Sequence, residues 1–290
     1  MRVLVRQYLL IILLFLSTIF VIIFGNIYFD QRNKNQAIVA NIGQKTKVDQ
    51  EQNKDDAPNE GDLKSDVAND TILNDLVKES QRYGSARISL LGSSIPQKSS
   101  LPKEKTWISL LQSDLKSNVK DLGQLSYIVN DYGSLTTTEI LKQDLAEVIK
   151  QQVPTIILFE MAIFNDYRQN IPIELTLANL EKIMNQFAEK APNAKVVFLS
   201  PNRTTEMGSN LLGLKPKDYL ERSKEFIQAK GWNFIDIYEG FEKQRLNEGR
   251  ALSQVLLKDG RSPNVMGNQY IFHTVKEYLM KQGEQGTWQF

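Results

Sequence analysis

The sequence predicts an α/β domain built on a parallel sheet of five strands, and two observations support this fold class. Five short apolar segments alternate with segments whose apolar residues recur at helical spacing. The short segments are almost continuously apolar, which is typical of strands covered by helices on both faces. We expect the strands at residues 87–91, 126–129, 155–159, 195–199 and 233–237.

Helices are expected before, between and after these strands, because apolar side chains repeat there at three- and four-residue spacing. The first would begin behind a capping Asn69 or Asp70, where the folded domain starts. In parallel α/β sheets, ligands lie beyond the carboxyl ends of the strands, so the residues that follow each strand are the functional candidates. The expected helices cover residues 72–83, 107–115, 140–149, 177–187, 219–226 and 271–279.

Composition excludes several function classes. The chain has 290 residues, 41% of them apolar, and a formal net charge of +1 without a basic, aromatic-rich stripe. This argues against a nucleic-acid partner. The lack of cysteine excludes disulfides and thiolate ligands, and a single histidine excludes a histidine-rich metal site. We therefore expect neither a metal nor a cofactor.

An amino-terminal segment predicts a membrane anchor. It carries no charge from Tyr8 to Phe24 and stays largely apolar as far as Phe29. As a helix, residues 8–29 would be roughly 33 Å long, enough for a hydrocarbon core of about 30 Å. A cleaved signal peptide is disfavoured, because the apolar run is too long and no small-residue cleavage site follows it. We expect residues 1–30 to form a cytoplasmic tip and a transmembrane helix.

The flanking residues predict the topology. Arg2, Arg6 and the amino terminus precede the span, which favours a cytoplasmic amino terminus and an extracytoplasmic remainder at the cell membrane. Residues 31–69 are rich in Gln, Asn, Asp, Lys and Glu, which is typical of a disordered stalk. A flexible chain of about 39 residues would hold the domain, residues 70–290, on the order of 35 Å from the bilayer. A charged recognition tail is the alternative.

Three segments at the ends of expected elements could carry chemistry. Gly92-Ser93-Ser94 follows the first strand as a small-residue turn that could expose a hydroxyl. Asn165-Asp166 follows the third strand, and the segment 259–264, Asp-Gly-Arg-Ser-Pro-Asn, precedes the last helix. Taken singly, each pattern is also typical of an ordinary turn or helix cap.

Taken together and in this order, the segments resemble the sequence blocks of the SGNH (GDSL) hydrolase family, in particular its membrane-anchored Gram-positive branch. The resemblance covers roughly residues 86–282 and implies a flavodoxin-like, three-layer fold. It also implies ester hydrolysis or acyl transfer on a cell-envelope glycan or lipid. By the same resemblance, Ser94 is the nucleophile, Asn165 an oxyanion-hole donor and Asp259 the triad aspartate, with Ser93 in place of the usual aspartate.

Two blocks depart from the family pattern. The second block keeps Asn130 and Gly133 but lacks a second glycine, so Gly133 is the candidate for the oxyanion amide. In the last block, Ser262 stands where the family has its catalytic histidine. A serine nucleophile needs a neighbouring base, and losing that base costs about 10⁶ in kcat. The single histidine, His273, is expected on the solvent face of the last helix and therefore not to be the base.

Two functional hypotheses follow. The first is an ester hydrolase or acyl transferase that uses Ser94, Asn165 and a substituted base. The second, favoured by the missing histidine, is a non-catalytic module of the same fold that binds an envelope glycan or a membrane partner. A mechanism using only the carboxylates of Asp166 and Asp259 is a third, although such pairs usually serve glycosidic chemistry.

Protease shaving of intact cells tests the topology. We expect it to release a fragment that begins within residues 31–70, because an unfolded stalk outside the cell is cleaved readily. Mass spectrometry of the released peptides would locate the cuts. A domain that stays protected until lysis would reverse the predicted orientation.

Overall fold

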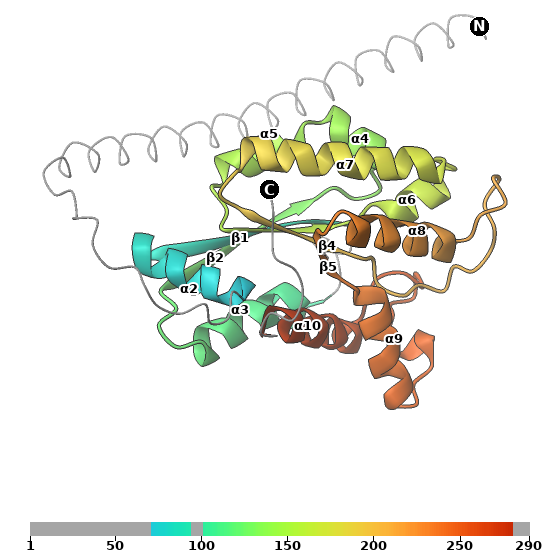
Figure 1. Cartoon of the computed structure of the whole chain (residues 1–290). Helices are drawn as coiled ribbons and strands as arrows, with labels where there is room; N and C mark the ends of the chain where they lie inside the picture. The colour runs from blue at the N-terminus through green and yellow to red at the C-terminus, as the bar shows by residue number, and fades with distance from the viewer. Residues whose placement is uncertain (1–70, 94–100, 281–290) are drawn as a thin grey trace, which may run out of the picture. The chain divides into compact units, whose positions relative to one another are not determined.

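Five parallel strands form the centre of the domain (Figure 1). The computed structural model describes residues 71–93 and 101–280, which belong to one unit of the chain. The sheet has the order β2-β1-β3-β4-β5, and each neighbouring pair is parallel. This is the flavodoxin-like order, which confirms the predicted fold class. The strands are β1 Ser85–Gly92, β2 Gln124–Asp131, β3 Ile156–Glu160, β4 Lys195–Leu199 and β5 Asn233–Ile235.

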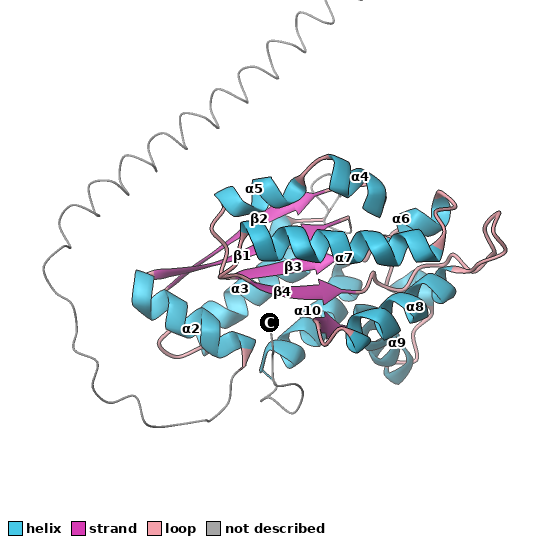
Figure 2. Ribbon diagram, turned by 45° about the horizontal axis from the view of Figure 1, so that its top comes forward, coloured by secondary structure: helices cyan, strands magenta, loops and turns pink. Residues whose placement is uncertain are grey.

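Helices cover both faces of the sheet and make three layers (Figure 2). One apolar core joins the sheet to α2 Ile72–Tyr83, α3 Trp107–Asn118, α9 Ile237–Asn247 and α10 Val265–Met280. The other core joins it to α4 Thr137–Lys142, α5 Leu145–Gln151, α6 Ile163–Arg168, α7 Ile173–Lys190 and α8 Pro216–Ala229. Two short 3₁₀ turns, Lys103–Lys105 and Leu252–Gln254, complete the described elements.

Burial on both faces explains why the strands read as continuous apolar runs. In β3, Ile156 and Leu158 belong to one core, whereas Ile157 and Phe159 belong to the other. Each of these four side chains is fully buried. Burying one such side chain contributes about 1.5–3 kcal/mol, so a polar residue at any of these positions would cost stability.

Several predicted boundaries were wrong. The helix expected at residues 140–149 is two helices, α4 and α5, separated by Asp144 in a left-handed conformation (φ 46°). The fifth strand ends at Ile235, because the Asp236 side chain accepts a hydrogen bond from the Glu239 amide and starts α9. The first helix is capped by Thr71, whose hydroxyl accepts from the Asn74 amide, rather than by Asn69 or Asp70.

The amino-terminal predictions remain untested. The expected span at residues 8–29 and the stalk at 31–69 lie outside the described residues. No helix within residues 71–93 or 101–280 is long and apolar enough to cross a membrane.

Gly267 lets α10 pack closely against the last block. A Cβ atom at this position would meet the Val255 carbonyl oxygen and lie 2.8 Å from the Pro263 Cβ atom. We expect Gly267→Ala to lower the free energy of unfolding by about 1–3 kcal/mol, despite the better helix propensity of alanine. Denaturant unfolding measures the change. Gly208→Ala is the control, because a Cβ atom there meets nothing within 4 Å; an equal effect in both variants would contradict the packing argument.

Candidate functional site

The first candidate segment leaves β1 at the carboxyl edge of the sheet. Gly92 pairs with Asp131 of β2, and the Ser93 hydroxyl donates to Glu160 Oε1 over 3.0 Å at the end of β3. Glu160 is buried, and its backbone carbonyl accepts a 2.8 Å hydrogen bond from the Tyr132 hydroxyl. Burial, aided by the Glu160 charge, raises the pKa of Tyr132 well above 10.0, so this hydroxyl remains a donor. Ser94, the expected nucleophile, lies outside the described residues.

Asn165 ties α6 to the loop between β2 and α4. It lies in α6, just after β3, and its side chain is buried. The amide Nδ2 donates to the carbonyl oxygens of Gly133 (3.1 Å) and Leu135 (2.9 Å), and Oδ1 accepts from Arg168 at 2.9 Å. Both hydrogens of the expected oxyanion donor are therefore engaged by the backbone. One of these bonds would have to be exchanged before Asn165 could donate to a substrate.

Gly133 is engaged as well. Its backbone is left-handed (φ 56°), and its amide donates to Asp131 Oδ1 over 2.7 Å. Its carbonyl accepts from Asn165, so the structure brings these two predicted site residues together. Asn130, the other residue kept from the second block, instead exchanges hydrogen bonds with the Gln152 side chain.

Asp166 is a structural carboxylate. It is fully buried and accepts hydrogen bonds from the Thr137 amide (2.8 Å) and from the hydroxyls of Thr137 and Thr176 (2.7 Å each). Burial raises its pKa, and these hydrogen bonds offset part of that shift. The contacts join α6 to α4 and α7. Because none of them involves Asp259, they lend no support to a mechanism built on the two carboxylates.

Ser262 and Asp259 are hydrogen-bonded to each other within the last block. Its hydroxyl donates to Asp259 Oδ2 over 2.6 Å, while the amides of Arg261 and Ser262 donate to Oδ1 over 2.9 Å each. Burial by itself would raise the pKa of Asp259, but these hydrogen bonds outweigh it and leave the pKa lowered. The aspartate is therefore satisfied within its own turn and is a weak base.

A charged network that the sequence did not reveal connects α6 to the last block. Glu206, in the loop after β4, accepts from Arg168 Nε (3.0 Å) and Nη2 (2.6 Å) and pairs with Arg261 over 2.7 Å. Since Arg168 also donates to Asn165, four side chains are linked in series. Burial would raise the pKa of Glu206, but the two guanidinium groups outweigh it and leave the pKa below 4.5. No local pattern marks this residue, because its partners are distant in sequence.

Backbone contacts strengthen the same connection. The Thr205 amide donates to the Gly260 carbonyl over 2.9 Å, and the Asn202 side chain donates to the Arg261 carbonyl over 2.9 Å. The loop after β4 and the last block therefore form one surface at the carboxyl edge of the sheet.

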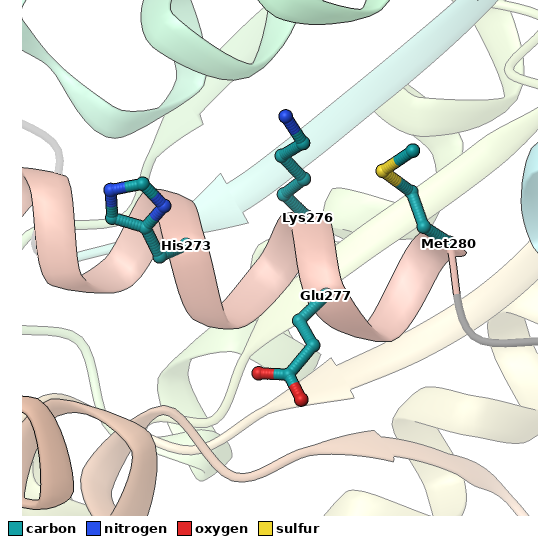
Figure 3. A pocket seen from close by; sticks show the side chains of 4 residues that line it. All are labelled: His273, Lys276, Glu277 and Met280. Carbon is teal, nitrogen blue, oxygen red and sulfur yellow. The ribbon is translucent and has the colours of Figure 1, made fainter.

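His273 is exposed on α10, as predicted. It lines a shallow hollow with Lys276, Glu277 and Met280, and none of these is a predicted site residue (Figure 3). The histidine lies eight residues into α10, roughly 12 Å along the helix from Val265, near which the last block ends. Within the described part of the chain, no group of three or more His, Asp or Glu side chains is arranged to hold a metal ion.

Comparison with solved structures identifies the architecture. The acetylxylan esterase of Geobacillus stearothermophilus superposes with a TM-score of 0.53 at 13% identity, over 68% of this chain and 95% of the esterase. The chain has a GDSL-esterase fold. A GDSL-like lipase of Parabacteroides merdae gives a TM-score of 0.53 at 14% identity, covering 67% of this chain and 95% of the lipase. No family model and no curated protein sequence matches the chain.

The GDSL-esterase fold agrees with the three-layer architecture that the sequence blocks implied. At such low identity, the likeness concerns the fold, and the roles of individual residues must come from their own contacts.

Replacing Glu206 tests the charged network. We expect Glu206→Gln to lower the free energy of unfolding by about 1–3 kcal/mol at pH 7, because two guanidinium groups lose their carboxylate. The pKa of Glu206 in the folded state lies below 4.5. The stability that its carboxylate contributes is therefore fully present above pH 4.5 and is lost as the pH falls through the folded-state pKa. The difference in unfolding free energy between Glu206→Gln and the unmodified protein should therefore become smaller in acid.

The matched control is Glu221→Gln, which removes the exposed Glu221–Lys217 pair. Such surface pairs contribute about 0–1 kcal/mol, so this variant should unfold nearly like the unmodified protein. Denaturant titrations between neutral and acidic pH make the comparison. A Glu206→Gln effect that is absent at pH 7, or that persists unchanged in acid, would rule out the network as described.

Proposed function

We propose that the protein is an esterase-like module, anchored in the membrane and exposed outside the cell, that binds an ester-bearing envelope glycan or lipid. On this proposal it hydrolyses the ester far more slowly than an intact serine esterase, if at all. The observation that carries the proposal is the 2.6 Å hydrogen bond from the Ser262 hydroxyl to Asp259. It preserves the frame of a triad but contains no group that could take a proton from a nucleophile.

The chemistry of a serine nucleophile explains the expected slow rate. Attack by a hydroxyl requires a base within hydrogen-bond reach, and the pKa of Asp259 is lowered while His273 is exposed on α10. Without a base, serine hydrolases retain roughly 10³–10⁴ over water, and this remainder comes from the oxyanion hole and binding. Here the Asn165 and Gly133 donors are already engaged in other hydrogen bonds, so we expect an even smaller residual rate enhancement.

Binding requires less than catalysis does. It requires an ordered surface beyond the strand ends, and the series Asn165–Arg168–Glu206–Arg261 holds the loops there in one arrangement. The uncharged segment from Tyr8 to Phe24 and the polar stretch 31–69 support the proposed anchor and the extracytoplasmic location. The candidate ligand class therefore comes from the cell envelope.

An active ester hydrolase or acyl transferase is the second candidate, favoured by the likeness to the acetylxylan esterase fold. In that case Ser94 would attack the ester carbonyl. Asn165 would exchange one loop carbonyl for the developing oxyanion, and a group that replaces the histidine would take the proton. The placement of Ser93 at the carboxyl edge is compatible with this chemistry.

Restoring the imidazole distinguishes the two candidates. We expect the unmodified protein to hydrolyse activated esters such as p-nitrophenyl acetate at a rate near background, and Ser262→His to raise that rate. A histidine there could accept the Ser94 proton while Asp259 orients it. The gain should disappear in the Ser94→Ala, Ser262→His double variant. Circular dichroism of each variant would verify the fold.

Two results would change the proposal. Fast turnover by the unmodified protein, abolished by Ser94→Ala, would establish an active esterase with another base. No gain from Ser262→His in a folded protein would show that the oxyanion donors are also disabled, which would leave the binding module.

A further inference from the structure

The loop between β4 and α8, residues 200–215, projects from the carboxyl edge of the sheet beside α6 and α8 (Figures 1 and 2). It exposes three large apolar side chains: Met207 is 63% exposed, Leu211 89% and Leu212 47%. We call these three residues the apolar tip. Other exposed apolar side chains in the described part of the chain are spread over different elements, which is normal for a protein surface.

The backbone of this loop is held without help from the apolar tip. Asn210 Oδ1 accepts from the amides of Leu212 (3.0 Å) and Leu214 (3.1 Å), and its Nδ2 donates to the Tyr167 carbonyl over 3.1 Å. The Leu211 amide donates to Asn170 Oδ1 over 2.7 Å. The leucine side chains are therefore displayed on a fixed turn, and they do not stabilise the domain by packing into its core.

The charged groups beside the apolar tip suit a lipid interface. Glu206, directly before Met207, is paired with Arg168 and Arg261, so its charge is compensated. Lys215 and Lys217 follow the tip and are exposed, although Lys217 shares its charge with Glu221. Apolar side chains that enter the acyl region, bordered by lysines at the headgroups, are the usual pattern of an interfacial membrane contact.

The sequence supplies a reason why a bilayer is the partner. The expected span at residues 8–29 and the stalk at 31–69 would hold the domain on the order of 35 Å from the lipid surface. Tethering of this kind raises the effective concentration of a weak contact. We propose that the apolar tip docks onto the outer lipid leaflet. The proposal rests on the proposed anchoring and specifies the ligand class, because it places the Glu206 network at the membrane, where the ester would be carried by a lipid.

A single fluorescent label on the full chain tests this contact. The chain contains no cysteine, so Leu211→Cys offers one site for an environment-sensitive dye such as NBD. In vesicles of phosphatidylcholine and phosphatidylglycerol, we expect doxyl-labelled lipids to quench this dye at least about twofold more than a dye at Val153→Cys. Val153 is a matched control, because it is apolar, 78% exposed and three residues before β3, at the opposite edge of the sheet.

Further variants make the outcome decisive. Met207→Ser with Leu212→Ser should reduce the quenching of the dye at residue 211 without changing the thermal unfolding of the domain. Equal quenching at residues 211 and 153 would overturn the proposal. So would a dye response that grows with protein concentration in lipid-free detergent, which would indicate a second copy, or shielding without lipid quenching, which would indicate cover by the chain itself.

Independent measurements separate this proposal from the proposed function. Carbonate extraction of the same vesicles reports on the anchor, because a transmembrane chain stays in the pellet. Ester hydrolysis by the Ser262→His variant reports on the site. Lipid quenching at residue 211 is a third readout that neither of the others determines.

Discussion

Burial of both faces of one parallel sheet is the constraint on which the rest of this structure depends. In β1 and β3, neighbouring residues such as Leu90 and Leu91 belong to opposite apolar cores, so helices must cover the sheet on both sides. Each connection between parallel strands then crosses a face and returns to the same end of the sheet. All five carboxyl ends therefore meet at one edge, where Ser93, Asn165, Glu206 and Asp259 come from four separate parts of the chain.

The polar groups at that edge are satisfied by one another. A polar group left unpaired in a partly buried site costs about 1–3 kcal/mol, so each of these groups needs a hydrogen-bond partner. Ser262 is such a partner, because its hydroxyl donates to the Asp259 carboxylate. The last block is thus held as a turn, and it contacts the loop after β4 through the Thr205–Gly260 hydrogen bond.

The loop after β4 joins the site to the surface. At its start, Thr205 and Glu206 contact the last block and α6, while Asn210 holds the second half against Tyr167. Ion pairs and hydrogen bonds thus hold the backbone of this loop, while the Leu211 side chain is exposed. This arrangement would couple the proposed lipid contact to the site, because Glu206 and Met207 are neighbours in one segment.

The sequence by itself determined the sheet and its class, because near-continuous apolar strands and helical periodicity are local signals of burial. It also placed His273 on the exposed side of α10, for the same reason. It could not show the break between α4 and α5, where Asp144 turns while the apolar pattern continues. Nor could it show α6, which is one short helix with five buried residues and no polar face to give a period.

Only the tertiary structure decided what the candidate side chains contact. The sequence marked Asn165 as a donor, but it did not show that the Asn165 amide is engaged by the Leu135 carbonyl, 30 residues away. The same holds for Glu206, whose two arginines lie 38 and 55 residues away. Hydrogen bonds and ion pairs between distant residues depend on distances of a few ångströms, and those distances exist only once the two cores have packed and the carboxyl ends have met at one edge.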